Sequence, residues 1–174
     1  MFFFQALFIR LEINAPFPSP FKFEAPKSDS PALLIYSGAT SLGLFTIGLA
    51  RLIRTPSGNP LRIFATASPK NHEKLLALGV EAVYDYRSPT WPDDLRKATN
   101  GGITYAVDCI SEDTSTARIS EAFVDGGGKI AVIRNATWLK EGVRKDVVPL
   151  YGAVWSGLGH ELIYNSQFTS NPTR

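Results

Sequence analysis

The sequence predicts an α/β fold in which helices cover both faces of a parallel sheet. Three observations support this prediction. Apolar runs of strand length alternate with helical patterns over residues 32–155. These runs are continuously apolar, as is typical of strands that are buried on both faces. A turn rich in small residues, at 37–43, joins the first run to the first helical pattern. Right-handed crossovers would make this a doubly wound, Rossmann-like dinucleotide-binding domain.

The part that precedes the alternation has a different composition. Residues 3–11 predict a short helix, because Phe4, Leu7, Phe8 and Leu11 fall on one face. Five prolines then occur in "NAPFPSPFKFEAPKSDSP", and repeated proline excludes the interior of a helix or sheet. We therefore divide the chain into an N-terminal helix (1–13), a Pro-rich linker (14–31), a Rossmann-like domain (32–165) and a polar tail (166–174).

The first two strand–helix units follow the linker. "ALLIYS" at 32–37 predicts a buried strand, and the helical pattern runs over 41–52. After the turn "TPSGNP", a second strand is expected at 61–67. The helix at 71–79 ends at Gly79, which suits a C-terminal cap.

The remaining units repeat this alternation. The third strand is expected at 81–86, and the next helix at 91–101 has Pro at its start and Gly just after its end. A fourth strand at 103–110 precedes a helix at 115–127, which glycines end. A fifth strand is expected at 128–134 and a sixth at 146–155. We expect the domain to be incomplete at its C-terminal end.

Composition and charge exclude several classes of protein. The chain has 174 residues, 44% apolar and 20% charged, with a net charge of +2, so nothing indicates nucleic acid or an anionic membrane as a partner. The single cysteine, Cys109, rules out an internal disulfide and indicates a reducing, cytoplasmic location. No apolar run spans a bilayer, and the opening "MFFFQALFIRLE" lacks the basic start of a signal peptide.

The turn after the first strand reads Gly38-x-Thr40-x-x-Gly43, close to the dinucleotide fingerprint G-x-G-x-x-G. Gly38 would permit the tight turn, and Gly43 would let the helix approach the strand. Thr40 replaces the middle glycine, which blocks the closest backbone approach but offers a hydroxyl to a pyrophosphate. The helix N-terminus adds free N–H groups and partial positive charge. The alternative is a tight connection in another α/β fold, without a ligand.

The end of the second strand favours NADPH over NADH. An NAD site normally has Asp or Glu there, whereas this chain has Thr66, Ala67 and Ser68, with Lys70 close behind. A hydroxyl and a cation suit a 2′-phosphate, and Tyr86 and Arg87 follow the third strand nearby. Ser68 also suits a helix cap and Lys70 a solvated lysine, and both interpretations hold together.

Four segments resemble the zinc-independent medium-chain dehydrogenase/reductase superfamily. They are "IYSGATSLG", "ATASPKNHEKLLALGVEAVYDYRSP", "YAVDCI" and "YGAVWSGLGHE". Within it the chain is most similar to the fungal trans-acting enoyl reductases of polyketide synthases, the lovastatin enoyl reductase type. The resemblance covers about residues 5–165.

The resemblance implies a cofactor, a reaction and a set of cofactor-binding residues. NADPH would transfer hydride to an α,β-unsaturated acyl thioester, presented by an acyl carrier domain of a polyketide synthase. The resemblance implies that the pyrophosphate is bound by Gly38, Ala39, Thr40, Ser41, Leu42 and Gly43. The 2′-phosphate would be bound by Ser68, Lys70 and Tyr86. The nicotinamide half would lie near Asp108, Cys109 and Ile110. Such enzymes are about twice as long, so the chain is expected to be a truncated cofactor-binding half.

Other chemistries find less support. His72, His160 and Cys109 lack metal-ligand spacing, so no metal site is expected. A short-chain reductase would need a Tyr-x-x-x-Lys pair, which the sequence lacks. Arg134 and Asn135 follow the fifth strand on the ligand side and are secondary candidates. No catalytic residue is assigned. A non-catalytic remnant that keeps the nucleotide-binding fold is the alternative function.

Overall fold

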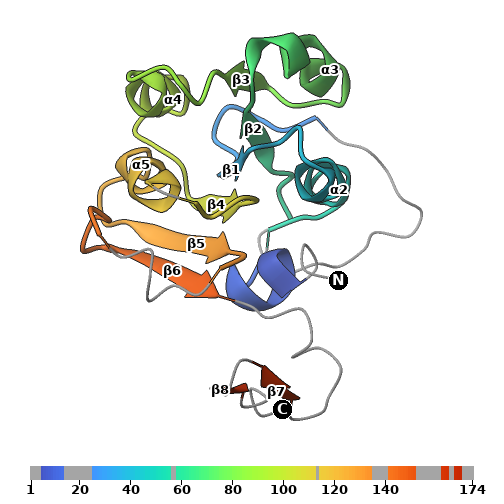
Figure 1. Ribbon diagram of the computed structural model, residues 1–174. Helices are drawn as coiled ribbons and strands as arrows, with labels where there is room; N and C mark the ends of the chain where they lie inside the picture. The colour runs from blue at the N-terminus through green and yellow to red at the C-terminus, as the bar shows by residue number, and fades with distance from the viewer. Residues whose placement is uncertain are drawn as a thin grey trace.

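The computed structural model describes residues 5–13, 25–55, 58–112, 114–134 and 141–151, and the backbone of two short strands near the C-terminus. Six strands form one parallel sheet in the order β3-β2-β1-β4-β5-β6 (Figure 1). They are β1 (Ala32–Tyr36), β2 (Arg62–Thr66), β3 (Ala82–Tyr84), β4 (Tyr105–Asp108), β5 (Gly128–Val132) and β6 (Val147–Tyr151). The predicted Rossmann-like parallel sheet is confirmed.

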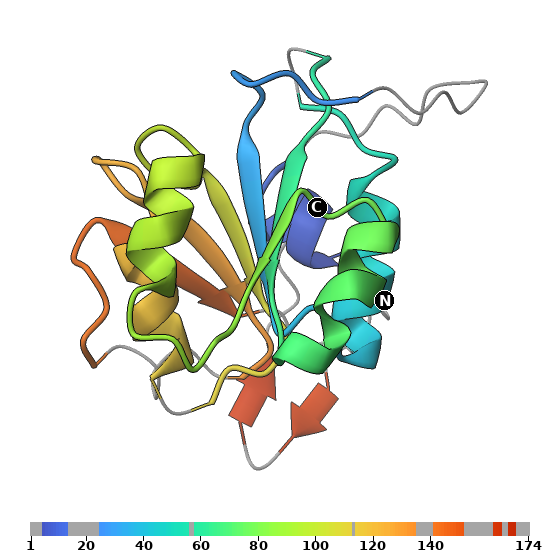
Figure 2. The ribbon, with the colours of Figure 1, turned by 90° about the horizontal axis from the view of Figure 1, so that it is seen from above.

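Helices cover both faces of this sheet (Figure 2). The helical elements are the π-helix η1 (Gln5–Arg10), α2 (Ser41–Ala50), the 3₁₀ turn η2 (Pro69–Asn71), α3 (His72–Ala77), α4 (Trp91–Ala98) and α5 (Ser115–Glu121). Helices α4 and α5 lie on one face, and η1, α2 and α3 lie on the other (Figure 1). Among the described residues, no helix has the length and apolar composition that crossing a membrane requires.

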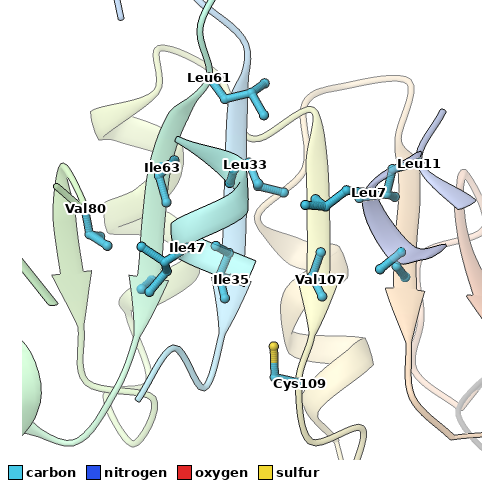
Figure 3. Packing of buried hydrophobic residues seen from close by; sticks show 14 of the residues in the cluster. Leu7, Leu11, Leu33, Ile35, Ile47, Leu61, Ile63, Val80, Val107 and Cys109 are labelled. Atoms are coloured by element: carbon cyan, nitrogen blue, oxygen red, sulfur yellow. The ribbon is translucent and has the colours of Figure 1, made fainter. Parts of the chain in front are cut away.

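The strands divide their side chains between two cores. Leu33 and Ile35 of β1 belong to the cluster beneath α2 and α3, whereas Leu34 belongs to the cluster beneath α4 and α5. This follows from the two-residue period of a strand, and it explains why the strands are apolar without alternation. Figure 3 shows the first cluster, in which Ile35 of β1 lies between Ile47 of α2 and Val107 of β4.

The N-terminal helix closes one end of that first cluster. Leu7 and Leu11 are buried in it, although some 20 residues separate them from β1. Helix η1 packs against β5, and Glu12 forms an ion pair of 2.7 Å with Lys129 of that strand. A helix is therefore present within the predicted segment 3–11, with π rather than α geometry. Residues 14–24 of the predicted linker and Asn135 lie outside the described residues.

Besides shifts of a few residues at the ends of other elements, two segments differ from the prediction. Helix α5 ends at Glu121 rather than at 127, because the chain that follows turns back to β4: Ile103 donates to Ala122 O and Val124 donates to Ile103 O. The predicted polar tail contains β8 (Gln167–Thr169), which pairs antiparallel with β7 (Leu162–Tyr164). Both differences come from pairing between separate segments, which local periodicity does not record.

Candidate functional site

A cleft of about 520 Å³ opens at the carboxyl ends of the parallel strands. Here β1 lies between β2 and β4, so the chain order reverses, and open α/β sheets bind ligands at such a point. The cleft is lined by Tyr36, Ser37, Ala39, Thr40, Ala67, Ser68, Asn71, Tyr86, Ile110, Glu112, Thr114 and Ser115. These residues come from the ends of four strands and the segments that follow them.

The turn between β1 and α2 is held by the end of β2. Ser37 has a φ of +62°, and its N–H donates to Thr66 Oγ1 at 2.9 Å. The N–H of Gly38 donates to the carbonyl of Thr66, also at 2.9 Å. Thr66 is fully buried, so the turn has a rigid support. The sequence places Thr66 at the end of the second strand, but its contact with Ser37, 29 residues away, is visible only in the structure.

Thr40 caps helix α2. Its hydroxyl accepts from the N–H of Gly43 at 3.1 Å and donates to the carbonyl of Ser37 at 2.9 Å. The proton that we expected to reach a pyrophosphate is therefore already used within the turn. In the described part of the chain, the N–H groups of Ala39, Ser41 and Leu42 have no acceptor. Free N–H groups at the start of a helix, together with the helix dipole, are groups that can bind an anion.

This arrangement predicts separate effects of Thr40 on stability and on binding. The Thr40→Ala variant should lose about 1 kcal/mol of unfolding free energy, as expected for a lost N-cap, and Thr40→Ser should keep it. The Kd for the dinucleotide that the sequence predicts should change less than about threefold, because the three free N–H groups remain. Thermal unfolding and a fluorescence titration measure the two quantities. A large loss of affinity at normal stability would show that the hydroxyl itself holds the ligand.

The two glycines of the turn serve close packing. A Cβ on Gly43 would lie 2.6 Å from the carbonyl oxygen of Gly38, and a Cβ on Gly38 would lie 3.0 Å from Ala65 Cβ. Real Cβ atoms essentially never lie as close to another atom as the 2.6 Å at Gly43, and the 3.0 Å contact at Gly38 is tighter than nine in ten real ones. The start of α2 therefore reaches the cleft because glycine lets the helix lie directly against the turn.

The opposite end of the cleft is formed by the segments after β2 and β3. Ser68 Oγ accepts from Asn71 Nδ2 at 3.0 Å, and both residues line the cleft with Tyr86. The guanidinium of Arg87 lies over the Tyr86 ring, 4.9 Å from its centroid. Lys70 is exposed on η2 and does not line the cleft. Asn71 was missed as a site residue, because in the sequence it reads as a helix start.

Asp108, at the end of β4, is fully buried and does not line the cleft. Its Oδ1 accepts from the N–H groups of Ile110 (3.1 Å) and Ser111 (2.7 Å). Its Oδ2 accepts from the hydroxyls of Ser115 (2.5 Å) and Thr116 (3.4 Å). Burial raises the pKa of this carboxyl, and the four hydrogen bonds oppose that rise. Asp108 therefore fixes the loop between β4 and α5, and that loop carries Ile110 into the cleft.

Cys109 points away from the cleft into the first core cluster (Figure 3). Burial, with a contribution from the nearby Asp108, raises the pKa of its thiol, although a hydrogen bond with Thr46 opposes this. A buried, protonated thiol is a packing group and a poor nucleophile. Of the three residues expected near the nicotinamide, only Ile110 lines the cleft.

Five of the twelve predicted cofactor-binding residues line the cleft, whereas Gly38, Ser41, Leu42 and Gly43 of the turn do not. The structure brings Ala39, Thr40, Ser68, Tyr86 and Ile110 into one lining. Glu112 and Thr114, which the sequence analysis did not select, belong to the same lining. Among the described residues, no group of three or more His, Cys, Asp or Glu has the arrangement of a metal site.

Comparisons with known proteins relate this chain to fungal enoyl reductases. No family model matches the chain. It is 36% identical over 114 residues to the enoyl reductase cheB of Chaetomium globosum, which covers 66% of this chain and 30% of that protein. It is also 36% identical over 116 residues to the trans-enoyl reductase RAP1 of Pyricularia oryzae, covering 67% and 31%. The chain thus spans about a third of the length of the curated relatives it matches.

Solved structures match the fold over most of the chain. The CurK enoyl reductase has a TM-score of 0.64 at 18% identity, covering 91% of this chain and 44% of its own. An NAD-dependent alcohol dehydrogenase has a TM-score of 0.62 at 19% identity, covering 86% and 39%. At these identities the likeness concerns the fold alone.

Proposed function

Because the homologues of this chain are fungal enoyl reductases, most of them named trans-enoyl reductases, we propose that it is the cofactor-binding part of an NADPH-dependent enoyl reductase. The proposed reaction reduces an α,β-unsaturated acyl thioester in fungal polyketide biosynthesis. The reaction class rests on these homologues, and the single structural observation that supports cofactor binding is the cleft at the point where the strand order reverses, with the capped N-terminus of α2 beside it.

The residues at this wall fit the pyrophosphate of a dinucleotide. Three backbone N–H groups lack acceptors within the described residues, those of Ala39, Ser41 and Leu42. The start of a helix of ten residues adds partial positive charge. Gly38 and Gly43 allow the approach on which this geometry depends. In the proposal these residues bind and orient the cofactor.

The other end of the cleft would hold the adenosine. Ser68 and Asn71 offer a linked hydroxyl and amide, and Tyr86 offers a phenol and an aromatic face. No carboxylate follows β2 at 67–72 to repel a 2′-phosphate, and Lys70 stands exposed beside Asn71. This donor set supports NADPH over NADH.

The bound cofactor would supply the hydride. The residues of this chain would position its two halves across the sheet edge, from Tyr86 at the adenosine end to Ile110 at the nicotinamide end. Asp108 would act indirectly, by fixing the loop that carries Ile110. The thiol of Cys109 would take no part. The proposed partner is an acyl carrier domain of a polyketide synthase, and the proposed location is the cytoplasm.

Cofactor preference can be tested with a matched pair of lysine variants. The purified chain is titrated with NADPH and NADH, followed by tryptophan fluorescence and by the rise in melting temperature that binding to the folded state produces. NADPH should bind more tightly. Lys70→Ala should raise the Kd for NADPH about fivefold, as for one partly exposed ion pair, and leave NADH unchanged. Lys74→Ala, which removes an exposed lysine from α3, is the control.

The outcomes separate the parts of the proposal. Equal losses for both cofactors in Lys70→Ala would contradict its role at the 2′-phosphate. Binding of neither cofactor by a cooperatively folded chain would overturn the proposed site. Binding without oxidation of NADPH in the presence of a crotonyl thioester would contradict the activity of this chain, while leaving the cofactor site supported.

A further inference from the structure

The cleft is lined by a single charged side chain among its described residues, and that side chain is acidic. Glu112 is this residue, and the lining contains no lysine or arginine. A nicotinamide dinucleotide carries at least two phosphate charges, so a carboxylate in the wall of its site opposes binding. Glu112 therefore needs a compensating charge if the cleft holds such a ligand.

Arg134 supplies that charge from a different strand end. It lies 22 residues further along the chain, just after β5, and its Nη2 is 2.5 Å from Glu112 Oε1. The two side chains are 52% and 49% exposed, so the pair is open to solvent, and Glu112 is its member that lines the cleft. Since β4 and β5 are neighbours in the sheet, their following loops meet at this edge.

The backbone around the pair is held in place. Ser111 Oγ accepts from the N–H of Ile133 at 3.0 Å and donates to the carbonyl of Asp108 at 3.2 Å. Ser111 is fully buried and adopts a φ of +53°. Ser111 precedes Glu112 and Ile133 precedes Arg134, so this hydrogen bond joins the two loops directly beside the ion pair. The pair is built on a fixed base, unlike most surface ion pairs.

We propose that Arg134 is a positioning residue of the cofactor site, which neutralises Glu112 and so allows the cleft to accept the phosphates of a dinucleotide. This inference rests on the proposed function. Arg134 acts through Glu112 and not on the cofactor itself. Removing the arginine alone should expose the ligand to an uncompensated carboxylate, whereas removing both charges should restore binding.

A double-mutant cycle tests this proposal. The Kd for NADPH is measured for Arg134→Gln, Glu112→Gln and the double variant, at about 0.05 M and about 0.5 M salt. Arg134→Gln should raise the Kd about three- to tenfold at low salt, and the effect should shrink at high salt through screening. The double variant should return to within about twofold of the natural chain. Arg134→Lys should bind nearly normally, because it keeps the charge.

Lys129→Gln is the matched control. It removes one cation from a partly exposed ion pair on the same strand, β5. Lys129 lies at the amino end of that strand, whereas the cleft lies at the carboxyl ends. Its Kd for NADPH should not change. Thermal unfolding of each variant, without cofactor, verifies that every chain compared is folded.

Each failure has a distinct meaning. If the natural chain binds no NADPH, the proposed function fails. If the natural chain binds and Arg134→Gln behaves like Lys129→Gln, the inference fails while the proposed function stands. If the double variant is as weak as Arg134→Gln, the arginine contacts the cofactor directly and neutralisation of Glu112 is overturned.

Discussion

Replacing Gly43 with alanine is expected to destabilise the chain by about 3 kcal/mol and to abolish measurable binding of NADPH. The added Cβ would lie 2.6 Å from the carbonyl oxygen of Gly38 and 2.7 Å from its Cα. Both are backbone atoms of a turn that hydrogen bonds fix to Thr66, so they cannot yield as a flexible side chain would. Overpacking of this kind costs about 1–3 kcal/mol, and here it displaces the helix start that carries the free N–H groups.

Gly48, in the same helix, provides the control for this substitution. It is exposed, and a Cβ there would meet nothing within 4 Å. The Gly48→Ala variant should therefore gain about 0.5–1 kcal/mol from helix propensity and bind normally. Chemical denaturation measures both variants. If Gly43→Ala were as stable as Gly48→Ala, the close approach of α2 to the turn would be wrong.

The second large effect is expected at Asp108. Its replacement by alanine should cost about 3–5 kcal/mol of unfolding free energy, because it leaves the N–H groups of the half-buried Ile110 and the buried Ser111 without an acceptor. The hydroxyls of Ser115 and Thr116 lose their acceptor as well. Denaturant unfolding measures the loss, and weaker NADPH binding should accompany it, since the loop that carries Ile110 is released.

Asp108→Asn separates the hydrogen bonds from the charge. The amide oxygen can keep both backbone bonds, and the amide nitrogen can donate to the two hydroxyl oxygens, so this variant should stay within about 1 kcal/mol of the natural chain at neutral pH. An equal loss in the alanine and asparagine variants would show instead that the negative charge itself is required.

The difference in unfolding free energy between the natural chain and Asp108→Asn should depend on pH with a known sign. Burial raises the pKa of Asp108 above its ordinary value of 3.8. As the pH rises above 3.8, the Asp108 carboxyl loses its proton in the unfolded chain before it does so in the folded chain. Between the two pKa values the folded chain therefore binds more protons than the unfolded chain. The stability of the natural chain relative to Asp108→Asn should therefore fall as the pH rises from 3.8 through the folded pKa. Denaturant unfolding at several pH values measures this difference, and a rise with pH would contradict it.

Local sequence determined the architecture of this protein. The alternation of apolar runs with helical patterns predicts the parallel sheet, because strands buried on both faces lack polar positions. Gly38, Gly43 and Gly79 mark a turn and a helix end through their backbone freedom and small size, which are properties of single residues. The position of the candidate site followed from the same information, since a parallel sheet with this chain order has its crevice beside the first turn.

Only the tertiary structure decided which side chains share the cleft and what each contacts. It joins Ser37 to Thr66 across 29 residues and Glu112 to Arg134 across 22. It turns Asp108 and Cys109 away from the cleft and brings Asn71 into it. Local pattern records the period and ends of an element, whereas these contacts depend on how loops from different strands meet at one edge. A carboxylate at a strand end reads alike in sequence whether it faces a ligand or four internal donors, and only packing distinguishes the two.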